Sequence, residues 1–459
     1  MSATPRKPRP AISEMFNPPT DNAIPPVPKL SATKNIASNT PDKTSKSSAA
    51  LRDQIRKAKA ARKSDVASTQ GSKTVASGYS TDAQSDPFNQ LPKLGTSLLK
   101  RRIDMARTDG RLNLIAMGLQ EFPPEVLKMY DFEANADSSV PWGEAVDLTR
   151  FNVADNDLKA IPDELFPDVD MANVDNNEEV DLPQFGGIEV LDLHGNLLRT
   201  LPMGLRRLER LTSLNLTRNN LDDNVFEVIS QIKPLRDLKL SECSLSGTLP
   251  ESIGQLHALK TLDLSGNKLT ALPDSMQSLT HLRILDVSQN KLTSLSLSIL
   301  QSCPLRDLLA TKNSLAGTLF PPSVPGHPRL ERLVVSCNSL TSLTPLPTLA
   351  LPSLATLDFS VNRITALPDL AACPQLTALL AEDNKLTELP RGFTALARLK
   401  SADFTGNDLR VIDEEVGLME ALVSLRVAAN PLRDRKFLTM GAEEIKKDLR
   451  GRLAPDLNF

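Results

Sequence analysis

One short unit, L-x-x-L-x-L-x-x-N/C-x-L, recurs about thirteen times between residues 112 and 433, and it is often continued by x-x-L-P. From Asn196 onward the ninth position recurs at intervals of 22 to 25 residues. This position holds the following residues: Asn156, Asn196, Asn219, Cys243, Asn267, Asn290, Asn313, Asn338, Asn362, Asn384, Asn407 and Asn430. So regular a repeat predicts an array of stacked units rather than a single compact core.

The spacing within one unit explains how such units would stack. The L-x-L step alternates, which predicts a short strand with both Leu side chains pointing inward. The Asn then turns the chain, and its amide can bond backbone groups of the turn and of the neighbouring coil. We expect Cys243 to play the same structural part. Stacking predicts an α/β leucine-rich-repeat solenoid, a curved horseshoe with a parallel β-sheet on its concave face and irregular or helical segments on its convex side.

Composition agrees with a solenoid core. Aromatic residues make up only 4% of the 459 residues, with one Trp and two Tyr, so the core must be built mainly from Leu. The four cysteines, Cys243, Cys303, Cys337 and Cys373, are not clustered, which disfavours a zinc site or a disulfide framework. No signal peptide and no apolar run long enough to span a membrane is visible, so we expect the cytoplasm, with the nucleus as the alternative.

A basic arm precedes the array. Residues 1–102 hold 18 basic residues (Lys and Arg) and 7 acidic residues (Asp and Glu), whereas the remainder of the chain holds 35 basic and 49 acidic residues. Residues 1–95 are rich in Pro, Ser and Lys and poor in aromatics, which predicts disorder. A short helix is predicted over 48–63, either a solvated transient helix, which we favour, or a basic helix that folds on a partner.

Caps and two inserts complete the domain organisation. Residues 96–111 are expected to form an N-terminal cap helix with Thr96 as N-cap, and 434–459 a C-terminal cap helix and tail in which Ile445, Leu449 and Leu453 share one face. Inserts are expected near 124–145 and 164–187. The second insert is acidic; a solvated loop is favoured, with a docking segment for basic partners and a metal site as the alternatives.

Three stretches carry a resemblance to a known family: SLLKRRIDMARTDGRLNLIAMGLQEFP, PWGEAVDLTRFNVADNDL and NPLRDRKFLTMGAEEIKKDLRGRL. With the repeat core they make residues 96–453 similar to the leucine-rich repeat-containing protein 40 family, within the intracellular, Ras-group-like leucine-rich-repeat proteins. The resemblance implies an intracellular protein-binding solenoid without defined chemistry. The long basic arm departs from that family's pattern.

Enzymatic chemistry is not expected, and neither a catalytic residue, a cofactor nor a bound metal is predicted. The four histidines, His194, His257, His281 and His327, fall in no metal-binding or nucleophile–base pattern. The sequence also lacks a Gly-rich phosphate loop and a G-x-S-x-G elbow. A solenoid offers an open surface rather than a closed pocket.

Binding is therefore the expected activity, and the concave face is its expected place. The position between the two strand Leu residues is mostly polar or acidic, but Leu309 and Val334 interrupt it. The predicted binding patch consists of Ile284, Leu309, Val334, Cys337, Val361 and Leu380, with an acidic rim of Asp263, Asp286, Asp358, Glu382 and Asp383. Exposed apolar clusters with polar rims mark interaction sites.

These features favour a non-enzymatic adaptor or scaffold in intracellular signalling, with another protein bound on the concave face. One alternative is a regulatory subunit of an enzyme, such as a phosphatase or small-GTPase complex. A second is nucleic-acid association through the basic arm, which is disfavoured because the arm lacks interleaved aromatic residues; the acidic concave face would itself repel phosphates. The sequence does not indicate an oligomeric state.

Overall fold

The computed structural model describes residues 91–131, 133–135, 140–169, 184–295 and 302–453, all within one compact unit, Ser85–Phe459. The helix expected over 48–63, almost all of the basic arm and residues 170–183 of the acidic insert lie outside the described residues. The described residues comprise the repeat array and its two caps.

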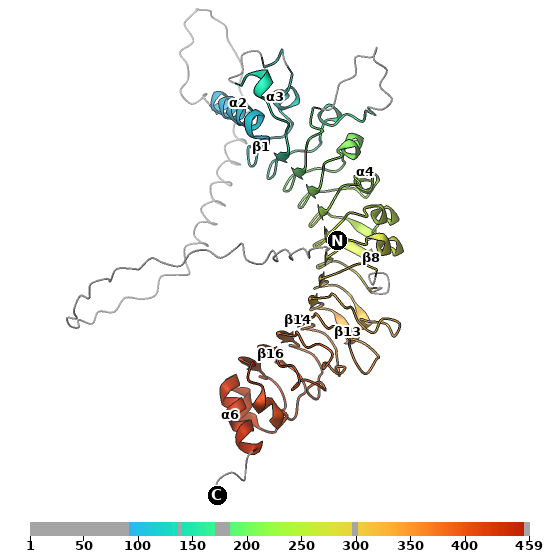
Figure 1. Cartoon of the computed structure of the whole chain (residues 1–459), viewed down its shortest axis with the longest axis vertical. Helices are drawn as coiled ribbons and strands as arrows, with labels where there is room; N and C mark the ends of the chain where they lie inside the picture. Colours follow the sequence, from blue (N-terminus) through green and yellow to red (C-terminus); the bar gives the residue numbers. More distant parts are fainter. Residues whose placement is uncertain (1–90, 132, 136–139, 170–183, 296–301, 454–459) are drawn as a thin grey trace, which may run out of the picture. The chain divides into compact units, whose positions relative to one another are not determined.

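Thirteen short parallel strands form one sheet within the described residues, and they follow one another in chain order (Figure 1). The strands are β1 (Arg111–Asn113), β2 (Arg150–Asn152), β3 (Val190–Asp192), β4 (Ser213–Asn215), β5 (Asp237–Lys239), β7 (Thr261–Asp263), β9 (Ile284–Asp286), β10 (Asp307–Leu309), β12 (Arg332–Val334), β14 (Thr356–Asp358), β15 (Ala378–Leu380), β16 (Ser401–Asp403) and β17 (Ser424–Arg426). This is the sheet of a leucine-rich-repeat solenoid.

The strands are in register because each buries its middle residue. That residue is Leu in most strands, and it is buried in all thirteen. Strand side chains alternate, so the first and third residues of each strand point away from the core. They form the surface that we call the concave face.

The return segments on the other side of each coil are short helical turns and small sheets. The 3-10 turns are η1 (Trp142–Glu144), η2 (Asp163–Leu165), η3 (Met203–Arg207), η4 (Glu251–Gln255), η5 (Asp274–Ser278), η6 (Glu414–Leu418) and η7 (Arg435–Leu438). The short α-helices are α3 (Pro124–Leu127) and α4 (Val225–Ile229); β6 (Ser246–Thr248) pairs with β8 (Lys268–Ala271), and β11 (Ala316–Thr318) with β13 (Ser339–Ser342). The proline of the L-P step directly precedes η2 to η5, where its fixed φ suits the start of a helical turn.

Helix α2 (Leu91–Asp109) covers the first coil and begins earlier than predicted. The sequence suggested a start at Thr96, but Pro92 is tolerated in a first turn, where a missing N–H costs no helical bond. The helix ends at Asp109, and the following Gly110, with φ of +71°, donates its N–H to the Ala106 carbonyl at 2.8 Å. Leu99, Ile103 and Ala106 are its buried face.

Helix α6 (Ala442–Leu453) covers the last coil. Ile445 and Leu449 are fully buried, but Leu453 is 41% exposed, so the predicted apolar face is one turn too long. The other two buried residues of the helix are Ala442 and Lys446. A charged residue in this place was not foreseen.

The first coils contain four of the five aromatic ring contacts of the described residues, because the inserts return to pack there. Phe151 stacks on Phe185 with ring centroids 6.1 Å apart, and Phe122, Tyr130 and Phe166 meet these two rings edge-on. The Tyr130 hydroxyl donates to the Val146 carbonyl at 2.7 Å, and burial raises its pKa to about 12. The two insertions thus contribute to one continuous core.

Candidate protein-binding face

The third residues of the strands form one continuous row across the concave face. Pairing between neighbouring strands places each of them beside the next. In order, this central row reads Asn113, Asn152, Asp192, Asn215, Lys239, Asp263, Asp286, Leu309, Val334, Asp358, Leu380, Asp403 and Arg426. The row is polar or charged except at three positions in its second half.

The structure brings together part of the predicted apolar patch. Leu309 and Val334 are register partners on β10 and β12. Leu380 follows in the same row, but Asp358 stands between it and Val334. All three apolar side chains are half-buried. The central row therefore presents one adjacent apolar pair and one separated apolar residue.

Cys337 and Val361 lie in a second row, at the turn that follows each strand. Each directly precedes a ladder Asn, and each has a left-handed backbone, with φ of +55° and +56°. The Val361 side chain is 44% exposed, whereas Cys337 is half-buried. The same turn position is left-handed in coils from Ala116 to Ala429, so this conformation belongs to the repeat. It is a genuine outlier only for a β-branched residue such as Val361.

Ile284 lies beside these residues in a different row. It is the first residue of β9, and its register partners are Thr261 and Asp307 in the row of first residues. Ile284 faces the same side of the sheet as Leu309 on the neighbouring strand, as a diagonal neighbour. Its place in the patch stays a prediction.

The acidic residues predicted as a rim also have a structural task that was not predicted. Asp263, Asp286 and Asp358 each accept the backbone N–H two residues further on, at 3.0, 2.9 and 3.0 Å. Asp192, Asn215 and Asp403 do the same in their own coils. These side chains close the turn that ends each strand. A sequence signal existed, because Asp or Asn is followed two residues later by Ser or Thr in most of these coils.

Glu382 and Asp383 differ from the other members of the predicted rim. Both are exposed, and Asp383 occupies the left-handed position beside Val361 with φ of +52°. The N–H of Val361 donates to the Glu382 carbonyl at 2.7 Å, so the two turns are adjacent. The apolar patch is thus bordered by negative charge at its C-terminal side.

The ladder of asparagines holds neighbouring coils together from inside the turns. Asn384 is 1% exposed, and its Nδ2 donates to the carbonyls of Phe359, Ala381 and Glu382. Its Oδ1 accepts the Ile364 N–H of the preceding coil at 3.0 Å. The same pattern recurs along the ladder, so these residues shape the face without forming part of its surface.

Cys243 occupies one rung of this ladder with a different hydrogen-bond pattern. Its thiol contacts the Leu216 carbonyl at 3.1 Å, and its backbone carbonyl accepts the Leu221 N–H, a donor for which other rungs use the Asn side chain. Burial raises the pKa of the thiol to about 11. A protonated, buried thiol is a structural donor rather than a nucleophile.

A charged cluster on the first half of the concave face was not predicted. His194 Nδ1 lies 2.7 Å from Asp192, and its Nε2 lies 3.5 Å from Asp155. Arg218 pairs with Asp155 at 2.9 Å. Three successive coils contribute to this cluster, which no local motif in the sequence announces.

The remaining His and Cys residues do not form a nucleophile–base pair within the described residues. Buried His327 contacts the backbone carbonyl of Cys303 at 3.2 Å, not its thiol, and burial lowers the pKa of this imidazole. Burial also raises the pKa of the Cys303 thiol to about 11. In the described ranges, His, Cys, Asp and Glu side chains form no group of three or more that could hold a metal ion.

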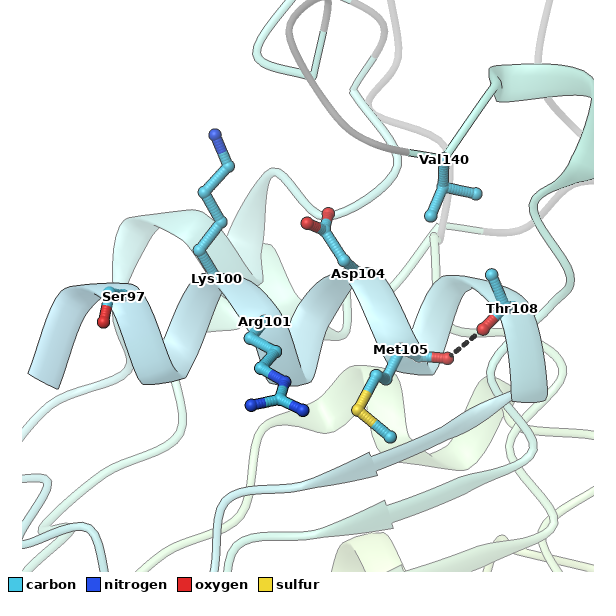
Figure 2. A pocket seen from close by; sticks show the side chains of 7 residues that line it. All are labelled: Ser97, Lys100, Arg101, Asp104, Met105, Thr108 and Val140. Atoms are coloured by element: carbon cyan, nitrogen blue, oxygen red, sulfur yellow. Dashed lines mark hydrogen bonds between the residues drawn. The ribbon is translucent and has the colours of Figure 1, made fainter.

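A separate hollow of about 470 Å³ is lined mainly by side chains of α2. Figure 2 shows side chains of the helix around it, with the Thr108 hydroxyl bonded to the Met105 carbonyl at 2.7 Å. Val140 of the first insert borders the hollow.

Among the helices described, none combines the length and apolar character needed to cross a membrane.

Comparison with known proteins agrees with the repeat geometry. Residues 233–309 and 328–386 match the model of the family described as leucine rich repeat. Mouse leucine-rich repeat and calponin homology domain-containing protein 1 is 34% identical over 167 residues, which cover 36% of this chain and 19% of that protein. Mouse podocan-like protein 1 is 27% identical over 67% of this chain and 49% of its own length. The chain thus spans about half or less of these relatives.

Solved structures share the fold at low identity. A leucine-rich-repeat protein of Leptospira interrogans has a TM-score of 0.51 and 22% identity, over 78% of this chain and 96% of that one. The ectodomain of the Arabidopsis thaliana receptor kinase GASSHO1/SCHENGEN3, in complex with CASPARIAN STRIP INTEGRITY FACTOR 2, has a TM-score of 0.51 and 24% identity, over 68% and 34%. At this identity the likeness concerns the fold.

Proposed function

Since the chain carries leucine-rich repeats that stack into a solenoid, we propose that it is a non-enzymatic adaptor or scaffold that binds another protein on its concave face. The observation that carries this proposal is the pair Leu309 and Val334, adjacent in a row that is otherwise mostly polar, with strained and exposed Val361 on the next coil. Such an apolar interruption has no role in closing the turns, which the polar members of the row perform.

The finer features of the function are part of the same proposal. We place the protein in intracellular signalling, in the cytoplasm, and within the leucine-rich repeat-containing protein 40 family, on the three stretches that resemble it. The receptor ectodomain in complex with its factor supports the proposal only in that a solenoid of this fold can hold a ligand. A regulatory subunit would bind through the same face and would bring enzymatic activity with it on purification.

Substitution of the adjacent apolar pair tests the proposal. Leu309→Asp with Val334→Asp puts two charges into the patch and leaves the buried middle residues of both strands unchanged. The matched control is Asn215→Asp with Lys239→Asp, which occupies the same row on adjacent strands β4 and β5. Affinity capture with quantitative mass spectrometry compares the three proteins.

We expect partners that the unmodified protein and the control enrich, and that the patch variant loses. All three proteins should give the same circular dichroism melt. Equal recovery of the same partners by the patch variant would contradict binding at this face. Loss of the partners by both variants would locate binding elsewhere on the sheet or make it a general effect of charge.

A further inference from the structure

A row of basic residues follows one edge of the sheet, where the chain enters the strands. Arg236, Lys260, Arg283 and Arg306 each directly precede a strand, on four successive coils. From Lys260 onward, the backbone N–H of each member donates to the carbonyl of the preceding member, at 2.7 to 2.8 Å. We call these four residues the basic ladder. They are in strict register because the sheet itself fixes their backbone positions.

The ladder side chains are open to an incoming group. Arg236, Arg283 and Arg306 are exposed, and Lys260 is partly exposed. Within the described part of the chain, one member of the basic ladder forms an ion pair. Arg306 pairs with Glu331 at 3.6 Å, and both side chains are about half exposed. Exposed pairs of this kind are worth little and exchange readily. Asp307, which follows Arg306, is bound by Arg332 at 3.1 Å.

The charge of this edge contrasts with that of the face beside it. The same coils place Asp263 and Asp286 in the central row of the concave face. A negatively charged partner is repelled from that row and attracted to the ladder, so the two surfaces select different ligands. The chain's own arm, residues 1–102, is basic and therefore carries the wrong sign to occupy the ladder.

The spacing of the ladder decides between kinds of acidic partner. Neighbouring strands lie about 4.8 Å apart, so four rungs present four cations over about 14 Å. An α-helix places side chains at i, i+4, i+7 and i+11 on one face, with a pitch of about 5.4 Å. An extended chain repeats its same-face side chains only every ~6.6 Å. A helix that lies along the stack therefore matches the rungs better.

We propose that the basic ladder Arg236–Lys260–Arg283–Arg306 is a second docking surface, which binds an α-helix with Asp or Glu on one face. This surface is distinct from the concave patch and does not depend on it. It would give the scaffold two sites of opposite preference, an apolar one on the sheet and an electrostatic one on its edge.

The test uses the full chain and a synthetic probe. The probe is a fluorescein-labelled, alanine-based helical peptide with Glu at i, i+4, i+7 and i+11. A permuted peptide of identical composition, with its Glu residues spread around the helix, is the ligand control. The ladder variant is Lys260→Glu with Arg283→Glu. Its matched control is Lys268→Glu with Lys291→Glu. These two exposed residues belong to the same coils as Lys260 and Arg283 and directly follow the ladder residues Asn267 and Asn290, so the charge change is the same but its place is different.

We expect the striped peptide to bind the unmodified chain, with an affinity that falls as salt rises. The ladder variant should bind about tenfold more weakly, because two attractive contacts become repulsive, while the control variant should differ by less than about twofold. Should the charge reversal unfold the chain, Lys260→Gln with Arg283→Gln replaces it and should weaken binding in the same direction.

Three results would overturn the proposal. Equal weakening in the ladder and control variants would show that only net charge matters. Equal binding of the striped and permuted peptides would remove the argument from spacing. Tighter binding of a single-stranded DNA oligonucleotide than of the striped peptide, lost in the ladder variant, would assign the edge to nucleic acid.

Discussion

The Nζ of Lys446 lies 2.7 Å from the carbonyl oxygen of Leu422. It also reaches the Met419 carbonyl at 3.4 Å, and the side chain is only 2% exposed. The same Nζ pairs with the Glu443 carboxylate at 2.7 Å. No backbone N–H of the described residues donates to the buried Leu422 carbonyl, so this carbonyl needs another donor. A lysine on the cap helix supplies that donor from within an otherwise apolar face.

Replacement of Lys446 by Met should loosen the C-terminal end of the array. Methionine keeps the packing volume but removes the ion pair with Glu443 and leaves the buried Leu422 carbonyl without a donor, which we expect to cost about 1–3 kcal/mol. The Met419 carbonyl keeps the Leu422 N–H as its donor. Hydrogen exchange of the last coil and of α6 measures this, because end coils of a solenoid can open separately. Lys447→Met, at the exposed neighbouring position, should leave exchange unchanged. Equal protection in both variants would contradict the capping role.

Asn384→Ala should destabilise the array by about 1–3 kcal/mol, because it leaves the buried Ile364 N–H without an acceptor. The carbonyls of Phe359, Ala381 and Glu382 lose one bond each but keep another donor. Urea unfolding followed by circular dichroism gives the change. The comparison is Asn220→Ala, one residue beyond the ladder and exposed, which should alter the free energy of unfolding by less than about 0.5 kcal/mol. Similar values for the two variants would mean that the amide ladder does not join the coils.

Val361→Gly should stabilise the protein by roughly 0.5–1 kcal/mol. The substitution relieves a left-handed β-branched residue at φ +56°, and the greater freedom of unfolded glycine offsets part of the gain. The reverse change at the equivalent position two coils away, Gly406→Val, should be destabilising, since a Cβ there would meet the Asp383 carboxylate. If the Val361→Gly variant also captures less partner, then Val361 stabilises the complex although it destabilises the free protein.

The four thiols should differ sharply in reactivity. Cys243, Cys303 and Cys373 are buried and burial raises the pKa of each, so at pH 8 the native chain should react with a thiol reagent at half-buried Cys337 first. Cys337→Ser should abolish the fast phase, and unfolding in urea should expose the remaining three. A second thiol that reacts fast in the native protein would show that the buried segment around Cys243, Cys303 or Cys373 opens.

The same burial predicts a loss of stability in alkali. Unfolded thiols ionise near pH 8.5, whereas native Cys243 and Cys303 stay protonated to about pH 11. The folded state therefore holds these protons more tightly than the unfolded state. The resulting contribution to the free energy of unfolding is complete below the unfolded pKa and is lost between about pH 8.5 and 11. Urea midpoints over this range measure the effect, which Cys243→Ser should reduce. An unchanged slope in that variant would exclude Cys243 as a source.

Part of the concave face could be predicted from the sequence. The adjacency of Leu309 and Val334 follows from counting repeats, because a fixed period puts equivalent positions on neighbouring strands. Ile284 lies on the strand beside Leu309, as counting predicts, but in the row of first residues rather than in the central row. The bonds of Asp263, Asp286 and Asp358 to the backbone were not predicted, because they depend on the geometry of the turn, although the Asp-x-Ser spacing of these coils indicates them.

Periodicity alone determined the parallel sheet, the Leu core and the positions of the Asn ladder, because those features depend on the alternation and spacing of residues within one repeat. Only the tertiary structure decided which polar groups have hydrogen-bond or ion-pair partners in another coil. Lys446 meets Leu422 across 24 residues, and Arg218 pairs with Asp155 across 63. Such contacts arise between coils, where stacking rather than local preference sets each neighbour.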